Sequence, residues 1–191
     1  MQRSTVVMLA ITVLLAGCVN EPPERQVEDI VVVPTVQEPV AMPAWMGTDH
    51  TNATHTYEEF ANASYMAYFS APWCAHCEPT IDAYDSLLPA GKIVVFSMEA
   101  REEYSNMSQW HNDTETNLNR TVDRPFIREP SLAKALGVRS MPHAIFINAQ
   151  GYVFHVQVGK ITNATAIQTI WESTEGAVFD PTTGWNRSIE L

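Results

Sequence analysis

Two cysteines separated by two residues, Cys74 and Cys77, are the part of the sequence best suited to chemistry. A strand-like run over residues 65–69 precedes them, and apolar residues at helical spacing follow them: Ile81, Tyr84 and Leu88. This pattern predicts a strand-to-helix junction with the thiols on adjacent turns at the start of the helix. Backbone N–H groups and the helix dipole stabilise an anion there. We therefore expect a Cys74 thiolate with a lowered pKa, and Cys77 placed to resolve a mixed disulfide.

The N-terminus has the pattern of an export signal. Arg3 precedes an apolar run over residues 6–16, which is too short to span a bilayer. The run leads into the tetrapeptide Leu-Ala-Gly-Cys, which ends at Cys18 and resembles the lipobox of prokaryotic lipoproteins. We predict a signal peptide over residues 1–17 and lipid on Cys18. An ordinary secretory signal that contains a cysteine is the alternative.

The cysteine count supports this division. The chain has 3 cysteines, and an odd number needs an explanation in an exported protein. With Cys18 assigned to lipid, Cys74 and Cys77 form the pair that is left, so there is no disulfide framework. A structural staple is the alternative, but so short a loop gains little stability on closure. The pair therefore indicates a redox function.

Composition limits the class of protein. A chain of 191 residues with 46% hydrophobic residues predicts one globular domain with tails. The net charge of -11 and the scarcity of lysine argue against a nucleic-acid partner. An acidic surface fits either a saline setting or ordinary solubility.

Asparagine is distributed unusually. The Ser and Thr content predicts about one or two Asn-x-Ser/Thr triplets by chance. The chain instead has seven such asparagines: Asn52, Asn62, Asn106, Asn112, Asn119, Asn163 and Asn186. The excess indicates N-glycosylation on an exposed face. Together with the lipobox, it resembles the pattern of an archaeal surface lipoprotein.

The first half of the chain contains a tether, a short helix and a strand. Residues 18–47 are rich in proline and predict an extended tether, in which the apolar run 30–33 is either an edge strand or a patch in the linker. Thr56 is a plausible N-cap for a short helix that follows it. Residues 92–98 form a continuous apolar run typical of a buried parallel strand. Residues 99–130 are polar and predict an insertion with a helix and a long surface loop.

The second half predicts a helix, a hairpin and a closing helix. A short helix over residues 131–136 ends at Gly137. Two apolar runs, 144–148 and 152–158, flank a turn and predict an antiparallel hairpin. An amphipathic segment from 163 to 173 covers the sheet. The order predicts an α/β domain over residues 48–176, with a central mixed four- to five-stranded sheet flanked by helices, and a C-terminal tail over 177–191.

Two motifs in this order resemble those of the thioredoxin family. The first is Ala-Pro-Trp-Cys-Ala-His-Cys, which ends at Cys77, and the second is Leu-Gly-Val-Arg-Ser-Met-Pro, which ends at Pro142. The resemblance covers about residues 56–175 and implies a thioredoxin-like fold. It also implies that Pro142 is cis and lies against the sulfurs, and that Met141 presents backbone groups to an extended substrate. Trp73 either flanks the substrate groove or packs as a core aromatic.

The sequence departs from the family pattern at two positions. Many thioredoxins have a buried Asp six residues before the first active cysteine, where this chain has Tyr68, so proton handling must differ. A histidine before the second cysteine, here His76, is a feature in which this chain resembles protein disulfide isomerase and periplasmic disulfide oxidases. A protonated His76 near the Cys74 thiolate would stabilise the reduced form and make the disulfide more oxidising. The alternative is an exposed histidine with no redox role.

The resemblance implies a thiol-disulfide oxidoreductase anchored by lipid to the outer face of the cytoplasmic membrane. Its partners would be exported protein thiols or disulfides and a membrane redox partner, and we expect no cofactor. The lipid end and the insertion resemble membrane-anchored thioredoxins that keep exported thiols reduced. His76 instead indicates oxidation or isomerisation, so the direction of electron flow stays open.

A second class of function rests on His143. With Cys74, Cys77 and Met141 it would offer soft ligands to copper or zinc, as in a metal-binding module or metallochaperone. Copper-handling relatives use a different cysteine spacing and a dedicated distant histidine, which this sequence does not identify. We therefore assign no metal ligand.

Overall fold

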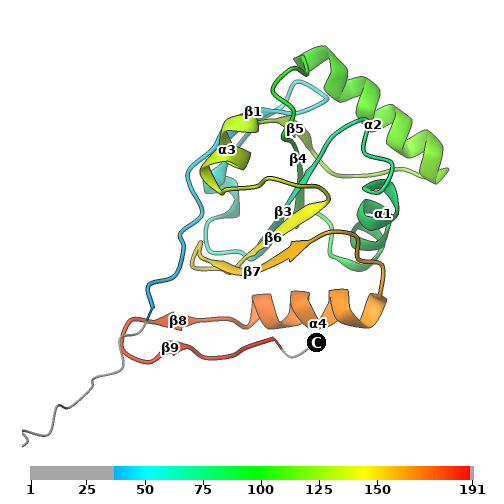
Figure 1. Ribbon diagram of the computed structural model, residues 1–191. Coiled ribbons are helices and arrows are strands. Elements are labelled where there is room, and N and C mark those ends of the chain that lie inside the picture. Colours follow the sequence, from blue (N-terminus) through cyan, green and yellow to red (C-terminus); the bar gives the residue numbers. More distant parts are fainter. Residues whose placement is uncertain (1–36, 190–191) are drawn as a thin grey trace, which may run out of the picture. The chain divides into compact units, whose positions relative to one another are not determined.

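A computed structural model describes residues 37–189 (Figure 1). The predicted signal peptide, Cys18 and the apolar run 30–33 lie outside the described residues. Within the described part, no helix has both the length and the apolar character needed to cross a membrane.

The core of the domain is a five-stranded mixed sheet in the order β5-β4-β3-β6-β7. β3 pairs in parallel with β4, and β4 with β5, whereas β6 and β7 run antiparallel. This confirms the predicted mixed sheet. The strands are β3 (Tyr65–Ser70), β4 (Ile93–Ser97), β5 (Phe126–Arg128), β6 (His143–Ile147) and β7 (Val153–Val158). All residues of β3 and β4 are buried, which explains their continuous apolar runs.

Helices cover both faces of the sheet. α1 (Glu78–Leu87), α2 (Tyr104–Leu118) and α4 (Ala164–Glu175) bury side chains in one core cluster, which includes Cys74 and Cys77. α3 (Pro130–Ala135) and the N-terminal segment, which contributes Met42 and Trp45, bury theirs in a second cluster. Side chains alternate between the two clusters along each central strand, as the pleat requires. Figure 1 shows α3 and α1 on opposite sides of the sheet.

Several local predictions agree with the structure. The short helix after Thr56 is a 3-10 turn, η1 (Tyr57–Phe60), and the Thr56 N–H donates to the Glu59 carboxylate at 2.8 Å. Gly137 has a φ of +70° and follows α3, where a left-handed residue ends the helix. Asn163 caps α4 by accepting the Ala166 N–H at 2.9 Å.

The packed domain extends beyond the predicted boundary at residue 48. Met42 is 4% exposed, and β1 (Met46–Thr48) pairs with β2 (Thr54–Thr56) as a small hairpin. A Cβ at Gly47 would lie 2.3 Å from the Ile127 side chain, so this position needs glycine for the hairpin to reach β5. The hairpin is thus part of the domain.

Two segments are more ordered than the sequence pattern indicates. The stretch 99–130 contains α2 and also β5, an edge strand too short to give a periodic signal. After residue 176, β8 (Phe179–Asp180) and β9 (Gly184–Trp185) form a hairpin. The Asn148 amide donates to the Ala177 carbonyl at 3.0 Å, which fastens this hairpin to the end of β6.

Candidate active site

The two cysteines lie in the turn between β3 and α1 and are joined by a disulfide. The Cys77 N–H donates to the Cys74 carbonyl at 2.9 Å, which closes the turn. The first helical N–H groups, those of Thr80 and Ile81, donate to the Cys77 carbonyl. Cys77 is therefore the residue that precedes the helix, and Cys74 lies one turn outside it. We expected Cys74 on the first helical turn, but the helix begins at Glu78, with proline in its first turn.

The two cysteines differ in exposure. Cys74 is 9% exposed and Cys77 is 2% exposed. The side chains next to them in the turn face solvent, and Trp73 is 63% exposed. Cys74 is therefore the more accessible of the two cysteines. His76 is exposed in the same turn.

A small cavity lies behind the disulfide. Ser70, Trp110 and Thr114 line it together with both cysteines and Glu78. Asn117, on α2, donates from Nδ2 to Glu78 Oε1 at 2.6 Å. This bond ties α2 to the start of α1 beside the redox pair, so the insertion contributes directly to the site.

Tyr68 lies under the cysteine turn. It is fully buried, and its hydroxyl donates to the Cys77 carbonyl at 3.0 Å. Burial raises the pKa of Tyr68 far above its usual range, and the nearby Tyr84 hydroxyl adds to this effect. Tyr68 is therefore a hydrogen-bond donor that holds the turn, and it does not supply the carboxylate that many thioredoxins have at this position.

The second motif lies against the same core cluster. The Met141–Pro142 peptide bond is cis, and Met141 packs against the cluster that includes both cysteines. Pro142 is buried, and its carbonyl accepts the Gly159 N–H at 2.8 Å. Met141 therefore packs on the core cluster that contains both cysteines, although the two motifs are far apart in sequence.

His143 faces away from the cysteines. It pairs with Phe69 across the sheet, and its ring lies edge-on to the Phe69 ring at 6.5 Å. Phe69 belongs to the core cluster on the α3 side, whereas the cysteines belong to the other. Burial lowers the pKa of His143. Within residues 37–189, no three His, Cys, Asp or Glu side chains are placed to hold a metal ion. The structure therefore gives no support to a cysteine–His143 metal site.

Comparisons with solved structures identify the architecture. A thiol:disulfide interchange protein of the thioredoxin family from Chlorobium tepidum matches with a TM-score of 0.58 at 19% identity, over 73% of this chain and 99% of that chain. The exposed lipoprotein thioredoxin of Streptococcus pneumoniae matches with a TM-score of 0.57 at 17% identity, over 68% and 98%. A thio-disulfide isomerase from Thermus thermophilus matches with a TM-score of 0.56 at 15% identity, over 73% and 98%.

The chain has the thioredoxin-like fold. No protein-family model and no curated protein sequence matches it. The likeness therefore lies in three-dimensional structure, and the two motifs remain the sequence evidence that accompanies it.

On this thioredoxin-like fold, Glu99 is a residue near the cysteine turn that no sequence motif indicates. Glu99 follows β4, and the Arg101 guanidinium donates to both Glu99 carboxylate oxygens at 3.0 Å. These bonds lower the pKa of Glu99 to about 2, and the Trp73 side chain contributes in the same direction. The end of β4 lies beside the start of the cysteine loop, because the Met98 N–H donates to the Ser70 carbonyl at 3.2 Å. A single Glu in a polar stretch carries no signal that would have identified it.

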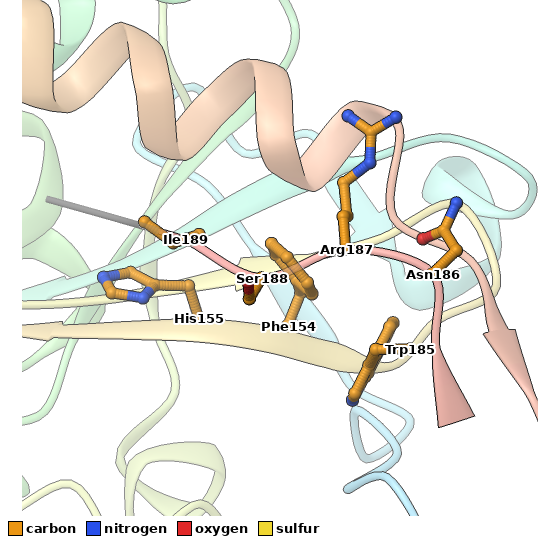
Figure 2. Close-up of a pocket in the computed structure, with 7 residues that line it drawn as sticks. All are labelled: Phe154, His155, Trp185, Asn186, Arg187, Ser188 and Ile189. Atoms are coloured by element: carbon orange, nitrogen blue, oxygen red, sulfur yellow. The ribbon is translucent and has the colours of Figure 1, made fainter. Parts of the chain in front are cut away.

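A larger hollow, of about 640 Å³, lies between β7 and the C-terminal segment. Figure 2 shows the side chains that line it, among them Phe154 and His155 of β7 and Trp185 to Ile189. Arg187 points towards α4, where its guanidinium donates to the Glu172 carbonyl at 3.4 Å. Neither cysteine lines this hollow, so it is separate from the redox site.

Proposed function

We propose that this protein is an extracytoplasmic thiol-disulfide oxidoreductase that exchanges disulfides with exported proteins through Cys74 and Cys77. The observation that carries the proposal is the disulfide at the start of α1, whose outer residue Cys74 is 9% exposed while the inner residue Cys77 is 2% exposed. The thioredoxin-like fold supports it, since two of the similar structures are described as proteins of thiol-disulfide exchange.

In the reducing direction, the Cys74 thiolate attacks one sulfur of a substrate disulfide. The substrate S–S bond breaks, a mixed disulfide forms, and the second substrate sulfur leaves as a thiolate. Cys77 then loses its proton and attacks Cys74 Sγ, which releases the first substrate sulfur. Two electrons pass to the substrate, its two thiolates take up two protons, and the Cys74–Cys77 disulfide remains. Oxidation of a substrate dithiol is the same sequence in reverse.

The neighbouring residues have distinct roles in this proposal. The start of α1 stabilises the Cys74 thiolate through the partial positive charge at the N-terminal end of the helix dipole. Met141 and Pro142 shape the substrate groove on one side, and Trp73 borders it on the other. His76 adds a positive charge near the thiolate when it is protonated, which favours the reduced form.

The proposed location follows from the N-terminal sequence. A signal peptide over residues 1–17 and lipid on Cys18 would anchor the domain to the outer face of the cytoplasmic membrane, with the chain between Cys18 and the packed residue Met42 as a tether. One of the similar structures is described as an exposed lipoprotein. Exported protein thiols and a membrane redox partner would then be within reach.

Two cysteine variants test the chemistry. Cys74→Ser should abolish reduction of insulin disulfides by the protein in the presence of a small dithiol. Cys77→Ser should stop after the first step and accumulate a mixed disulfide, seen as a covalent adduct by mass spectrometry. Cys18→Ser in the detergent-solubilised full chain is the control and should keep the wild-type rate. A Cys74→Ser protein with wild-type activity would refute the proposal.

The reduction potential decides the direction of electron flow. A value near that of thioredoxin, about -270 mV, assigns the protein to the reductases. A value above about -180 mV assigns it to the oxidases or isomerases. Equilibration with glutathione redox buffers, followed by thiol alkylation, measures it directly.

A further inference from the structure

The seven asparagine triplets have unequal access to solvent and unequal side-chain contacts. Glycosylation of a folded chain needs an Asn amide with no other contact at its Nδ2 or Oδ1, and an accessible hydroxyl two residues later. Six of the seven asparagines are exposed, and Asn106 is half-buried. Exposure of the asparagine alone therefore does not separate them, but the contacts of the amide and of the hydroxyl do.

Two of these triplets meet both conditions: Asn52–Thr54 and Asn119–Thr121. Asn52 has a φ of +69° in the turn between β1 and β2, and Asn119 has a φ of +51° at the C-terminus of α2. All four of these residues are exposed. Within the described part of the chain, neither amide and neither threonine hydroxyl has a side-chain hydrogen bond. Both asparagines thus lie in exposed tight turns.

The asparagines in these two turns have a simpler explanation, but the threonines do not. Asparagine tolerates the left-handed backbone conformation better than most residues, so the turns alone account for Asn52 and Asn119. Nothing in the local backbone requires an exposed threonine two residues later. Thr54 and Thr121 therefore supply a second observation that is independent of the turn geometry.

The hydroxyls at two other triplets are used inside the fold. Ser64, which completes the triplet of Asn62, is 7% exposed and donates to the Thr174 carbonyl at 3.5 Å. Thr114, which completes the triplet of Asn112, is 2% exposed and donates to the Trp110 carbonyl at 2.8 Å. A transferase acting on the folded protein cannot reach either hydroxyl.

The remaining three triplets have an asparagine amide that already makes a contact. Asn106 Nδ2 donates to Glu102 at 2.7 Å, and Asn163 Oδ1 accepts the Ala166 N–H as the cap of α4. Asn186 Nδ2 donates to the Gly176 carbonyl at 3.1 Å, while its Oδ1 accepts the Val178 N–H at 2.8 Å. Figure 2 shows Asn186 on the segment beside the end of α4. Modification at these sites would disturb contacts that hold the fold.

We propose that Asn52 and Asn119 are the N-glycosylation sites of the folded protein. The saccharide donor would be an oligosaccharide linked through phosphate to a lipid carrier. Asn Nδ2 attacks the anomeric carbon, a C–N bond forms, and the C–O bond to phosphate breaks. The lipid phosphate leaves with the electron pair, and the amide gives up one proton. Thr51 and Thr121 line one hollow, so the two glycans would stand on the same side of the domain.

Mass spectrometry of peptides from protein purified from its own organism tests the assignment. Glycan should be present at Asn52 and Asn119, with lower occupancy at each of the other five sites. Thr54→Ala and Thr121→Ala should each remove glycan from their own site, whereas Thr54→Ser and Thr121→Ser should keep it. Unmodified peptides at both sites, or higher occupancy at any of the other five, would overturn the proposal.

A second pair of measurements separates this assignment from the redox proposal. Cys74→Ser should leave the glycan pattern unchanged, and Asn52→Gln/Asn119→Gln should leave insulin reduction unchanged. Unfolding midpoints of the threonine variants verify that a lost glycan reflects the lost hydroxyl. A threonine variant that folds as the wild type yet keeps its glycan would refute the assignment at that site.

Discussion

The two ends of α1 are held in different ways. At the N-terminal end, the disulfide turn is bordered by the exposed side chains of Trp73 and His76. At the C-terminal end, the buried guanidinium of Arg124 donates to the Pro89 carbonyl at 2.9 Å and to the Leu88 carbonyl at 3.1 Å. One end is thus open to solvent, and the other is closed by a cation within the protein.

The closed end also contains an ion-pair network. Asp85 is 7% exposed at its side chain and accepts hydrogen bonds from both Arg124 and Arg120. Arg120 also pairs with Asp82 at 2.7 Å. Because the C-terminus of a helix carries partial negative charge, guanidinium groups there stabilise α1 directly. These ion pairs therefore fix α1 at the end opposite the disulfide.

The largest expected effect comes from removing the cation at the closed end. Arg124→Ala removes one of the two guanidinium groups that balance the charge of the Asp85 carboxylate. It also leaves the carbonyls of Leu88 and Pro89, at the C-terminal end of α1, without their hydrogen-bond donor. Removing one partner of a buried ion pair costs about 3–5 kcal/mol. We therefore expect a loss of this size in the free energy of unfolding, measured by urea titration of the oxidised protein.

The same variant should leave the redox pair unaffected where it remains folded. Its reduction potential should equal that of the wild type, because Arg124 lies at the opposite end of the helix. Arg101→Ala is the matched control, since Arg101 is 88% exposed at its side chain, and its loss should cost less than about 0.5 kcal/mol. An Arg124→Ala protein as stable as the wild type would show that the two ends do not differ in this way.

A smaller effect is expected at the open end, and it concerns redox rather than stability. His76→Ala removes a group that stabilises the Cys74 thiolate when it is charged. The reduced form then becomes less favourable, so the reduction potential should become more negative, by about 30 mV for each 1.4 kcal/mol lost. The unfolding free energy should change by less than about 0.5 kcal/mol. Equilibration with glutathione buffers measures the first quantity and urea titration the second.

Lys134→Ala is the control for the charge itself. Lys134 is exposed on α3, which packs on the other face of the sheet, so its removal should not alter the potential. If His76→Ala has the potential of the wild type, His76 is only an exposed residue of the turn, which was the alternative raised by the sequence.

The open end was predicted from sequence far better than the closed end. Cys74, Cys77 and Pro142 carry local motifs, and the strands around them are apolar runs long enough to give a periodic signal. The helix start was predicted one turn too early, because the first hydrogen bonds of α1 are accepted by the Cys77 carbonyl and residue types do not reveal them. The sequence thus predicted that the helix exists, whereas its first residue is set by backbone hydrogen bonds.

The closed end depends on contacts that sequence does not reveal. Arg124 and Asp85 are 39 residues apart, in an insertion and a helix that show no shared pattern. The position of His143 is a similar case. Its place after Pro142 indicated the site, but the pleat of β6 turns its side chain to the opposite face. The type of a residue predicts its chemistry, whereas the face of the sheet on which its side chain lies depends on the exact register of the strand.

The smallest expected effect is a dependence of stability on pH next to the closed end. His50 and Arg124 line the same hollow, and the His50 ring stacks on the His111 ring at 3.7 Å. Burial lowers the pKa of His50 below its usual value of 6.5, and His111 adds to this shift, against weaker opposite effects of Asp49 and Glu115. The unfolded chain therefore binds the proton more readily than the folded protein. The contribution of His50 is complete above pH 6.5 and is lost as the pH falls through the lowered pKa.

Urea titrations between pH 8 and pH 5 measure this decline, and two variants separate its sources. His50→Asn keeps an acceptor for the Phe126 N–H, which His50 Nδ1 accepts at 3.3 Å, and should make the decline shallower. His55 is the control of opposite sign. Burial alone would lower the pKa of His55, but its bonds to Glu59 and Asp49 outweigh burial and raise the pKa. Its contribution is present below pH 6.5 and is lost as the pH rises, so His55→Asn should make the decline steeper. If the unfolding free energy changes with pH at the same slope in both variants, neither histidine makes the stability of the protein depend on pH.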